Sequence, residues 1–120
     1  MRIFKVKWFA RFARKERISD AALLAAIRRA EDGLVDADLG GHLIKQRVAR
    51  AGQGRSGGYR TIIAIRTGQR AFYLYGFAKS TQADLAPDEE ENYKAAAKRL
   101  LDLSEETLSG LVEVGALTEI

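Results

Sequence analysis

The sequence has 120 residues, of which 47% are hydrophobic and 30% charged, so we expect one globular domain over residues 1–120. It has no cysteine, which excludes disulfides and thiolate chemistry, and neither a membrane span nor a secretory signal, so we expect a cytoplasmic protein. Residues 1–83 hold 17 Lys and Arg against 6 Asp and Glu, whereas residues 84–120 hold 3 against 10. The split is typical of a polyanion-binding body with an acidic tail, unless the charges only solvate two faces.

The first predicted element is a helix. Phe4, Trp8 and Phe12 recur every four positions, which predicts a helix over residues 4–15 with an apolar stripe and a basic opposite side. A short strand over residues 2–6 is the alternative, because the period is not decisive so close to the terminus.

A second helix is predicted between two capping residues. Ser19 can accept a hydrogen bond from a free amide of the next turn, which suits an N-cap. The helix then runs to about residue 32, and Gly33 fits the C-terminal position that needs a positive φ. Residues 34–41, which end in two glycines, are predicted to form a loop.

Three strands follow in the basic middle of the chain. Alternation predicts the first over residues 42–48, and the four glycines of residues 50–58 predict a mobile, positive loop after it. Residues 59–66 and 70–77 are predicted strands joined by a short hairpin loop at 67–69. Three consecutive strands indicate an antiparallel meander.

The acidic end of the chain is predicted to be helical. Pro87 and the acids after it suit a first helical turn, and Ser104 is a candidate cap for a further short helix. The fold class is therefore α+β: a small antiparallel sheet of three to four strands, flanked by two N-terminal helices and by C-terminal helices.

The usual catalytic motifs are missing. His42 is the single histidine, so no pair of histidines can share acid and base work, and its place after two glycines favours a surface or structural role. Asp36 and Asp38 are too few to suggest a metal cage. We therefore expect no metal and no cofactor, and any nuclease activity to be metal-independent.

The basic middle instead combines cations with aromatic rings. Lys45 and Arg47 share one face of their strand by alternation, and Arg60 opens the next strand. On the last strand, parity groups a set of rings with a lysine: Tyr73, Tyr75, Phe77 and Lys79. Cations that take phosphates and rings that stack on bases suit single-stranded RNA.

Such a set can also cleave RNA, which carries its own nucleophile. A protein can orient the 2′-hydroxyl in line with phosphorus and stabilise the charged transition state with Arg and Lys. The competing interpretation is structural: rings such as Tyr59, Phe72 and Tyr73 are more often core residues, and single cations on a sheet are more often solvated.

Three segments and an acidic helix have recognisable sequences: FARFARKERISDAALLAAI, DLGGHLIKQRVARAGQGRSGGYRTIIAI, AFYLYGFAKS and EENYK. Together they resemble the RelE/HigB-like toxins of type II toxin–antitoxin systems, in the branch often labelled cytotoxic translational repressors. The resemblance covers about residues 3–103 and depends on the combination of KxR, GxGrsGGYR and YGFAK. It implies a RelE-like fold and an mRNA interferase that cuts mRNA in the ribosomal A site without metal.

The resemblance also implies site residues and a partner. The matching catalytic positions are Lys45, Arg47, Arg60 and Lys79, and the RNA-binding positions are Arg50, Arg55, Tyr75 and Phe77. No histidine lies near the end of the last strand, which leaves the general base and acid open. The implied partner is a cognate antitoxin, often a small helix-turn-helix protein from the same operon. The related ParE branch leaves DNA gyrase as an alternative target, and an inactive RNA-binding module is the third possibility.

Overall fold

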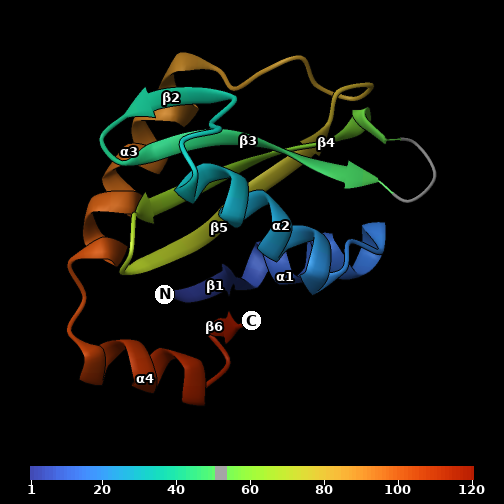
Figure 1. Ribbon diagram of the computed structural model, residues 1–120. Helices are drawn as coiled ribbons and strands as arrows, with labels where there is room; N and C mark the ends of the chain where they lie inside the picture. The colour runs from blue at the N-terminus through green and yellow to red at the C-terminus, as the bar shows by residue number, and fades with distance from the viewer. Residues whose placement is uncertain (51–53) are drawn as a thin grey trace.

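The computed structural model (Figure 1) describes residues 1–50 and 54–120, and the side chains of residues 1–49 and 58–120. Within these residues, six strands form one mixed sheet in the order β2-β3-β4-β5-β1-β6. The elements in chain order are β1 (Arg2–Val6), α1 (Lys7–Glu16), α2 (Asp20–Glu31), β2 (Ala37–Gly40), β3 (Leu43–Arg50), β4 (Gly54–Arg66), β5 (Arg70–Ala78), α3 (Pro87–Leu101), α4 (Glu105–Glu113) and β6 (Leu117–Glu119).

Helices cover both faces of the sheet, and each face has its own apolar core. Strand alternation sends Ile63 and Tyr73 toward α1 and α2, where they pack with Phe9 and Leu23. The opposite set of residues packs under α3 and beside α4: Phe4, Leu43, Ile62, Ala64, Phe72, Leu74, Ala97, Leu101, Leu108 and Leu117. In Figure 1, α1 and α2 lie in front of the sheet and α3 lies behind it.

The helix predicted over residues 4–15 begins later than expected, and the alternative of a short strand is confirmed. Residues 2–6 form β1, which pairs in parallel with β5, so that Phe4 lies opposite Phe72 with ring centroids 5.1 Å apart. Ile3 and Phe4 are buried on opposite faces, which is strand alternation. The predicted helix began too early because Phe4, a residue of β1, happens to lie four positions before Trp8, which belongs to the helix that starts at Lys7.

Two segments predicted to be loops contain strand residues. Within residues 34–41, β2 pairs with β3 across a register shift between Asp38 and Gly40. The glycine-rich segment 50–58 was predicted as a loop; residues 51–53 lie outside the described residues, and β4 begins at Gly54, opposite Arg50. Glycine does not prevent strand pairing when neighbouring strands supply the ladder, although it weakens a strand.

The sheet is larger than the predicted three to four strands, and it is not purely antiparallel. The predicted meander is confirmed as β3-β4-β5. β1 joins β5 in parallel, and β6 closes the edge by pairing antiparallel to β1. The two chain ends therefore lie side by side in the sheet (Figure 1). The three residues of β6 give too little periodicity to be predicted, and β1 was expected only as the alternative to a helix.

The predicted starts of α2, α3 and α4 and the predicted end of α2 are confirmed. Ser19 Oγ accepts a hydrogen bond from the amide of Ala22 at 3.1 Å, and Gly33 has a φ of +84°. Pro87 opens α3, and Ser104 Oγ accepts from the amide of Thr107 at 3.1 Å at the start of α4. None of the helices that the structure describes is long and apolar enough to cross a membrane.

Candidate nucleic-acid interface

Two rows of side chains cross the middle strands on the face that α3 covers. Lys45 of β3 is in register, across β4, with Tyr75 of β5, and Arg47 is in register with Arg60 and Phe77. Directly paired residues of neighbouring strands lie on one face of a sheet. The structure therefore brings three predicted cations and two predicted rings together. We call these residues the cationic face: Lys45, Arg47, Arg60, Tyr75 and Phe77.

Tyr73 does not belong to this face, although simple alternation predicted that it would. The register between β4 and β5 shifts at Ile62 and Ile63, so that Leu74 has no partner in the ladder. This β-bulge leaves Tyr73 among the residues under α1 and α2, where its hydroxyl donates to the carbonyl of Leu23 at 2.6 Å. Burial raises the pKa of Tyr73, and the ring is a core residue.

Lys45 is paired with a carboxylate from the segment between β5 and α3. Its Nζ donates to Asp84 Oδ2 at 3.1 Å, and its side chain is only 22% exposed. The amide of Leu85 and the Lys45 ammonium lower the pKa of the Asp84 carboxyl, which therefore remains ionised at neutral pH. The Asp84 carboxylate thus occupies Lys45, a cation that the sequence analysis assigns to the RNA site.

The backbone of Arg47 is hydrogen-bonded to a carboxylate, but its side chain is more exposed to solvent than that of Lys45. The Arg47 amide donates to Asp36 Oδ2 at 2.6 Å, whereas its Nε is 4.0 Å from Asp36 Oδ1. Nearly half of the Arg47 side chain is exposed. The guanidinium is consequently positioned but only weakly neutralised.

Arg60 is the cation of this face that has a buried nitrogen, Nη1, without a hydrogen-bond partner among the described residues. A buried donor without an acceptor is unfavourable by about 1–3 kcal/mol, and by more when the group is charged. An acceptor that reached this nitrogen would remove that penalty.

The hydroxyl of Tyr75, one of the two rings, is held by the segment that follows β5. The Tyr75 hydroxyl donates to Gln82 Oε1 at 2.9 Å, and Gln82 Nε2 donates to the Asp84 carbonyl at 2.9 Å. Desolvation, with a smaller contribution from the Glu89 carboxylate, raises the pKa of Tyr75. Tyr75 therefore stays protonated at neutral pH and is a hydrogen-bond donor there rather than a base.

The other predicted site residues are not gathered in this way. Lys79 is exposed in the turn after β5 and has no hydrogen bond or ion pair with the described residues. The side chains of Arg50 and Arg55 lie outside the described part of the chain, so their predicted RNA contacts stay predictions.

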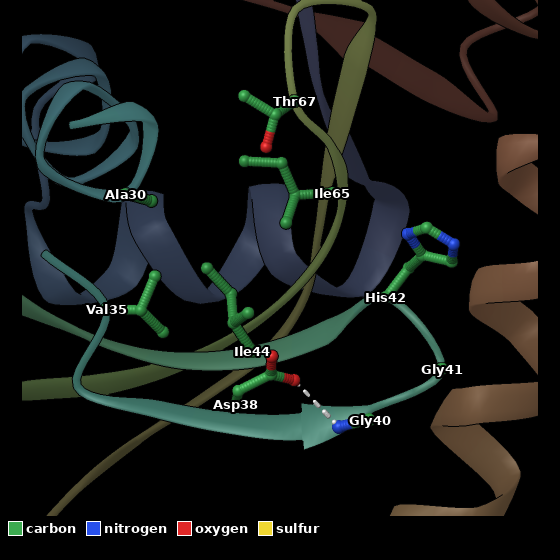
Figure 2. A pocket seen from close by; sticks show the side chains of 9 residues that line it. All are labelled: Ala30, Val35, Asp38, Gly40, Gly41, His42, Ile44, Ile65 and Thr67. Carbon is green, nitrogen blue, oxygen red and sulfur yellow. Dashed lines mark hydrogen bonds between the residues drawn. The ribbon is translucent and has the colours of Figure 1, made fainter. Parts of the chain in front are cut away.

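His42 lies at another place in the fold. It occupies the turn between β2 and β3 with a φ of +63°, and its carbonyl accepts from the amide of Ile65 at 2.9 Å. Figure 2 shows it at the rim of a cavity of about 360 Å³ whose floor includes Ile44 and Ile65. None of the predicted cations lines that cavity. Among the described residues there is also no cluster of three or more histidine and acidic side chains that could hold a metal ion.

Sequence reasoning missed the residues that position the cations. Asp84 lies 39 positions from Lys45, and Gln82 meets Tyr75 only because the chain folds back after β5. Sequence spacing carries no signal for either contact. Trp8 was predicted only as part of an apolar helical stripe; it is 41% exposed and contacts Tyr75, with ring centroids 4.7 Å apart.

Residues 1–120 match a family model that is described as the RelE toxin of the RelE/RelB toxin–antitoxin system. No curated protein sequence matches the chain.

Proposed function

The chain belongs to the RelE family, the toxins of RelE/RelB toxin–antitoxin systems, and on that premise we propose that this toxin is an endoribonuclease that cleaves mRNA on the ribosome and so inhibits translation. The observation that carries the proposal is Arg60, whose buried Nη1 has no acceptor in the described structure. A phosphate oxygen is the acceptor that a guanidinium binds best in RNA. Arg47, in register beside it, supplies a second guanidinium.

Charge stabilisation is the principal role of the cationic face. In-line attack of a 2′-hydroxyl on phosphorus builds negative charge on the non-bridging oxygens, and fixed cations lower the energy of that transition state. We assign this role to Arg60 and Arg47. Lys45 binds the phosphate once Asp84 is displaced, or moves a proton, and Lys79 contacts the phosphate or the leaving group. Arg50 and Arg55 are assigned to the RNA backbone.

The reaction needs two proton movements and no other reactant. The bond between the 2′-oxygen and phosphorus forms, the bond from phosphorus to the 5′-oxygen breaks, and a 2′,3′-cyclic phosphate remains. The 2′-hydroxyl loses its proton and the leaving 5′-oxygen gains one. Tyr75, protonated because its pKa is raised, fits donation or orientation rather than proton abstraction. Asp84 and Asp36 are paired with Lys45 and Arg47 of the cationic face, and two-metal chemistry needs several free carboxylates that converge on one site, so we propose that the cleavage is metal-independent.

The partner proposed for this toxin is a cognate antitoxin, a small helix-turn-helix protein from the same operon. Two routes to inhibition are compatible with the fold. The antitoxin can cover the cationic face and block access to RNA, or it can hold the terminal helices and prevent the toxin from entering the ribosome.

The proposal is tested by expressing the chain and mapping mRNA ends by primer extension. We expect growth arrest with cuts inside translated codons, and a decrease in cleavage on the order of 10²- to 10³-fold for Arg60→Ala, because one transition-state donor is removed. Arg99→Ala is the matched control, since Arg99 is an exposed arginine of α3 with no ion pair to the described residues. Thermal unfolding must show that both variants fold. Growth arrest with intact mRNA and altered DNA supercoiling would instead identify gyrase as the target.

A further inference from the structure

A cavity of about 250 Å³ lies where α1 crosses the end of β5. Its lining includes four aromatic rings, one flat amide and one cation: Trp8, Phe12, Tyr75, Phe77, Gln82 and Lys15. A second cavity of about 230 Å³ adjoins it on the outer side of α1, between Trp8 and Arg11. Tyr75 and Phe77 belong to the cationic face as well, so the cavity continues that face beyond the edge of β5.

The rings beside the cavity form a continuous aromatic series. Trp8 lies 5.3 Å from Phe12 and 4.7 Å from Tyr75 between ring centroids, and Tyr75 lies 6.0 Å from Phe77. The core under α1 is filled by Phe9, which is fully buried, whereas the larger Trp8 is 41% exposed. The indole makes no hydrogen bond with the described residues. An exposed, flat ring beside a cavity is a surface on which another flat ring can stack.

The charges around the cavity favour an anionic ligand. Lys15 and Arg11 line the two cavities and have no ion pair with the described residues. The one acid at the rim, Glu16, accepts a hydrogen bond from the Tyr59 hydroxyl at 2.9 Å. Flat rings combined with free cations match a nucleotide, whose base stacks and whose phosphate needs a cation.

The cavity lies within reach of an RNA strand bound at Arg60. Phe77 is the direct cross-strand neighbour of Arg60, which is a separation of about one strand spacing, or ~4.8 Å, between their backbones. A single strand whose phosphate contacts Arg60 can therefore place a neighbouring base past Phe77 and against Trp8.

We propose that the cavity between α1 and the end of β5 is a nucleobase subsite, in which a base next to the scissile phosphate stacks on Trp8 while Lys15 and Arg11 take the adjoining phosphate. The subsite deepens the RNA cleavage proposed above and rests on it. It makes Trp8 a binding residue for the RNA strand and a contributor to the choice of cleavage position.

Trp8 is the only tryptophan of the chain, so its fluorescence reports on this subsite directly. The full-length protein is titrated with a short single-stranded RNA that is 2′-O-methylated throughout and so cannot be cleaved. Binding is followed independently by the anisotropy of a dye on the RNA. We expect quenching of Trp8 in parallel with the anisotropy change, and about tenfold weaker binding for Trp8→Ala, as for loss of one stacked base. Trp8→Phe should restore most of the affinity.

Abasic RNAs locate the base that stacks. Removing a single base at each position in turn should abolish the quenching at one position only, and Trp8→Ala should cost no further affinity with that RNA. Leu34→Ala is the matched control, because Leu34 is an exposed apolar residue outside the cavity.

Three results would overturn the subsite in different ways. RNA binding that needs Arg60 but leaves Trp8 fluorescence and the affinity of Trp8→Ala unchanged removes the subsite and keeps the proposed function. No binding of the free RNA by either method removes the subsite, whereas the proposed function is decided separately by mRNA cleavage on the ribosome. A Trp8→Ala protein that binds RNA normally but binds its antitoxin poorly identifies the cavity as a protein-docking surface instead.

Discussion

At the scale of single residues, the cations of the sheet differ in how fully the protein neutralises them. Lys45 has an ion pair with Asp84, Arg47 has a distant one with Asp36, and the buried Nη1 of Arg60 has no acceptor in the described structure. A bound phosphate would therefore compete with Asp84 at Lys45 and fill an open position at Arg60. Removing the Asp84 carboxylate should therefore strengthen phosphate binding, whereas removing the Arg60 guanidinium should weaken it.

We predict that Asp84→Asn strengthens RNA binding several-fold, because the carboxylate no longer occupies Lys45. Loss of the pair should change the free energy of unfolding little, by about 0–1 kcal/mol, because the Asp84 side chain is 60% exposed. The measurement is the dissociation constant for uncleavable single-stranded RNA, with urea unfolding alongside.

Asp102→Asn is the control for Asp84→Asn. Asp102 pairs with Arg66 at 3.0 Å and is equally exposed, so it changes the net charge by the same amount away from the cationic face. Equal strengthening by both variants would show a general charge effect and would contradict the role assigned to Asp84.

At the scale of elements, the site depends on how closely α1 packs on β5. A Cβ added at Gly76 would lie 2.6 Å from Phe12 Cε2 and 3.1 Å from Phe9 Cε1. Glycine is therefore needed at this position for α1 to reach the strand, and α1 in turn carries Trp8 to Tyr75.

We predict that Gly76→Ala lowers the free energy of unfolding by about 1–3 kcal/mol, because α1 must shift to relieve the overlap. Gly110→Ala in α4 is the comparison: no atom lies within 4 Å of its added Cβ, so the gain in helix propensity should stabilise by up to about 1 kcal/mol. Chemical unfolding measures both. A Gly76→Ala protein as stable as the parent would contradict the close packing.

Elements with a long period and a capping residue could be predicted from the sequence, whereas β1 was foreseen only as an alternative to a helix and β6 was missed. Ser19 and Pro87 marked helix starts because capping is local chemistry. β1 and β6 exist because distant partners complete their hydrogen bonds, which no local pattern encodes. The face shared by Lys45 and Arg47 could be predicted because alternation within one strand is a local pattern. The bulge at Leu74, which places Tyr73 on the other face, could not, because it depends on how β4 and β5 pair.

At the scale of the whole molecule, carboxylates of the acidic C-terminal segment form ion pairs with arginines of the basic segment. Arg2 donates to both carboxylate oxygens of Glu119 at 2.9 Å and to Glu105 at 2.7 Å, and Arg70 also bonds Glu105 at 2.7 Å. Composition alone did not show whether the basic residues 1–83 and the acidic residues 84–120 interact. These ion pairs show that they do, at the sheet edge where the two chain ends lie.

This charge network predicts a loss of stability in acid. Hydrogen bonds from Arg2 lower the pKa of Glu105 and Glu119 below the usual 4.5. Their stabilisation is therefore complete above about pH 5 and is lost as the pH falls through the depressed values. We expect the melting temperature of the Glu105→Gln/Glu119→Gln protein to fall less between about pH 5 and pH 3 than that of the parent.

The matched control for the acid experiment replaces Glu106 and Glu113, which are exposed acids of α4 without an ion pair to the described residues. Its melting temperature should follow the parent's at every pH. If the Glu105→Gln/Glu119→Gln protein also followed the parent, the network would not stabilise the fold.

The most direct test of the central claim is the rate at which the purified toxin cleaves ribosome-bound mRNA. We predict cleavage that leaves a 2′,3′-cyclic phosphate, that a single 2′-O-methyl group at the scissile nucleotide abolishes, and that Arg60→Ala slows on the order of 10²- to 10³-fold while Arg99→Ala does not. Cleavage by a folded Arg60→Ala protein at the parent rate would contradict the claim that this cationic face carries the reaction.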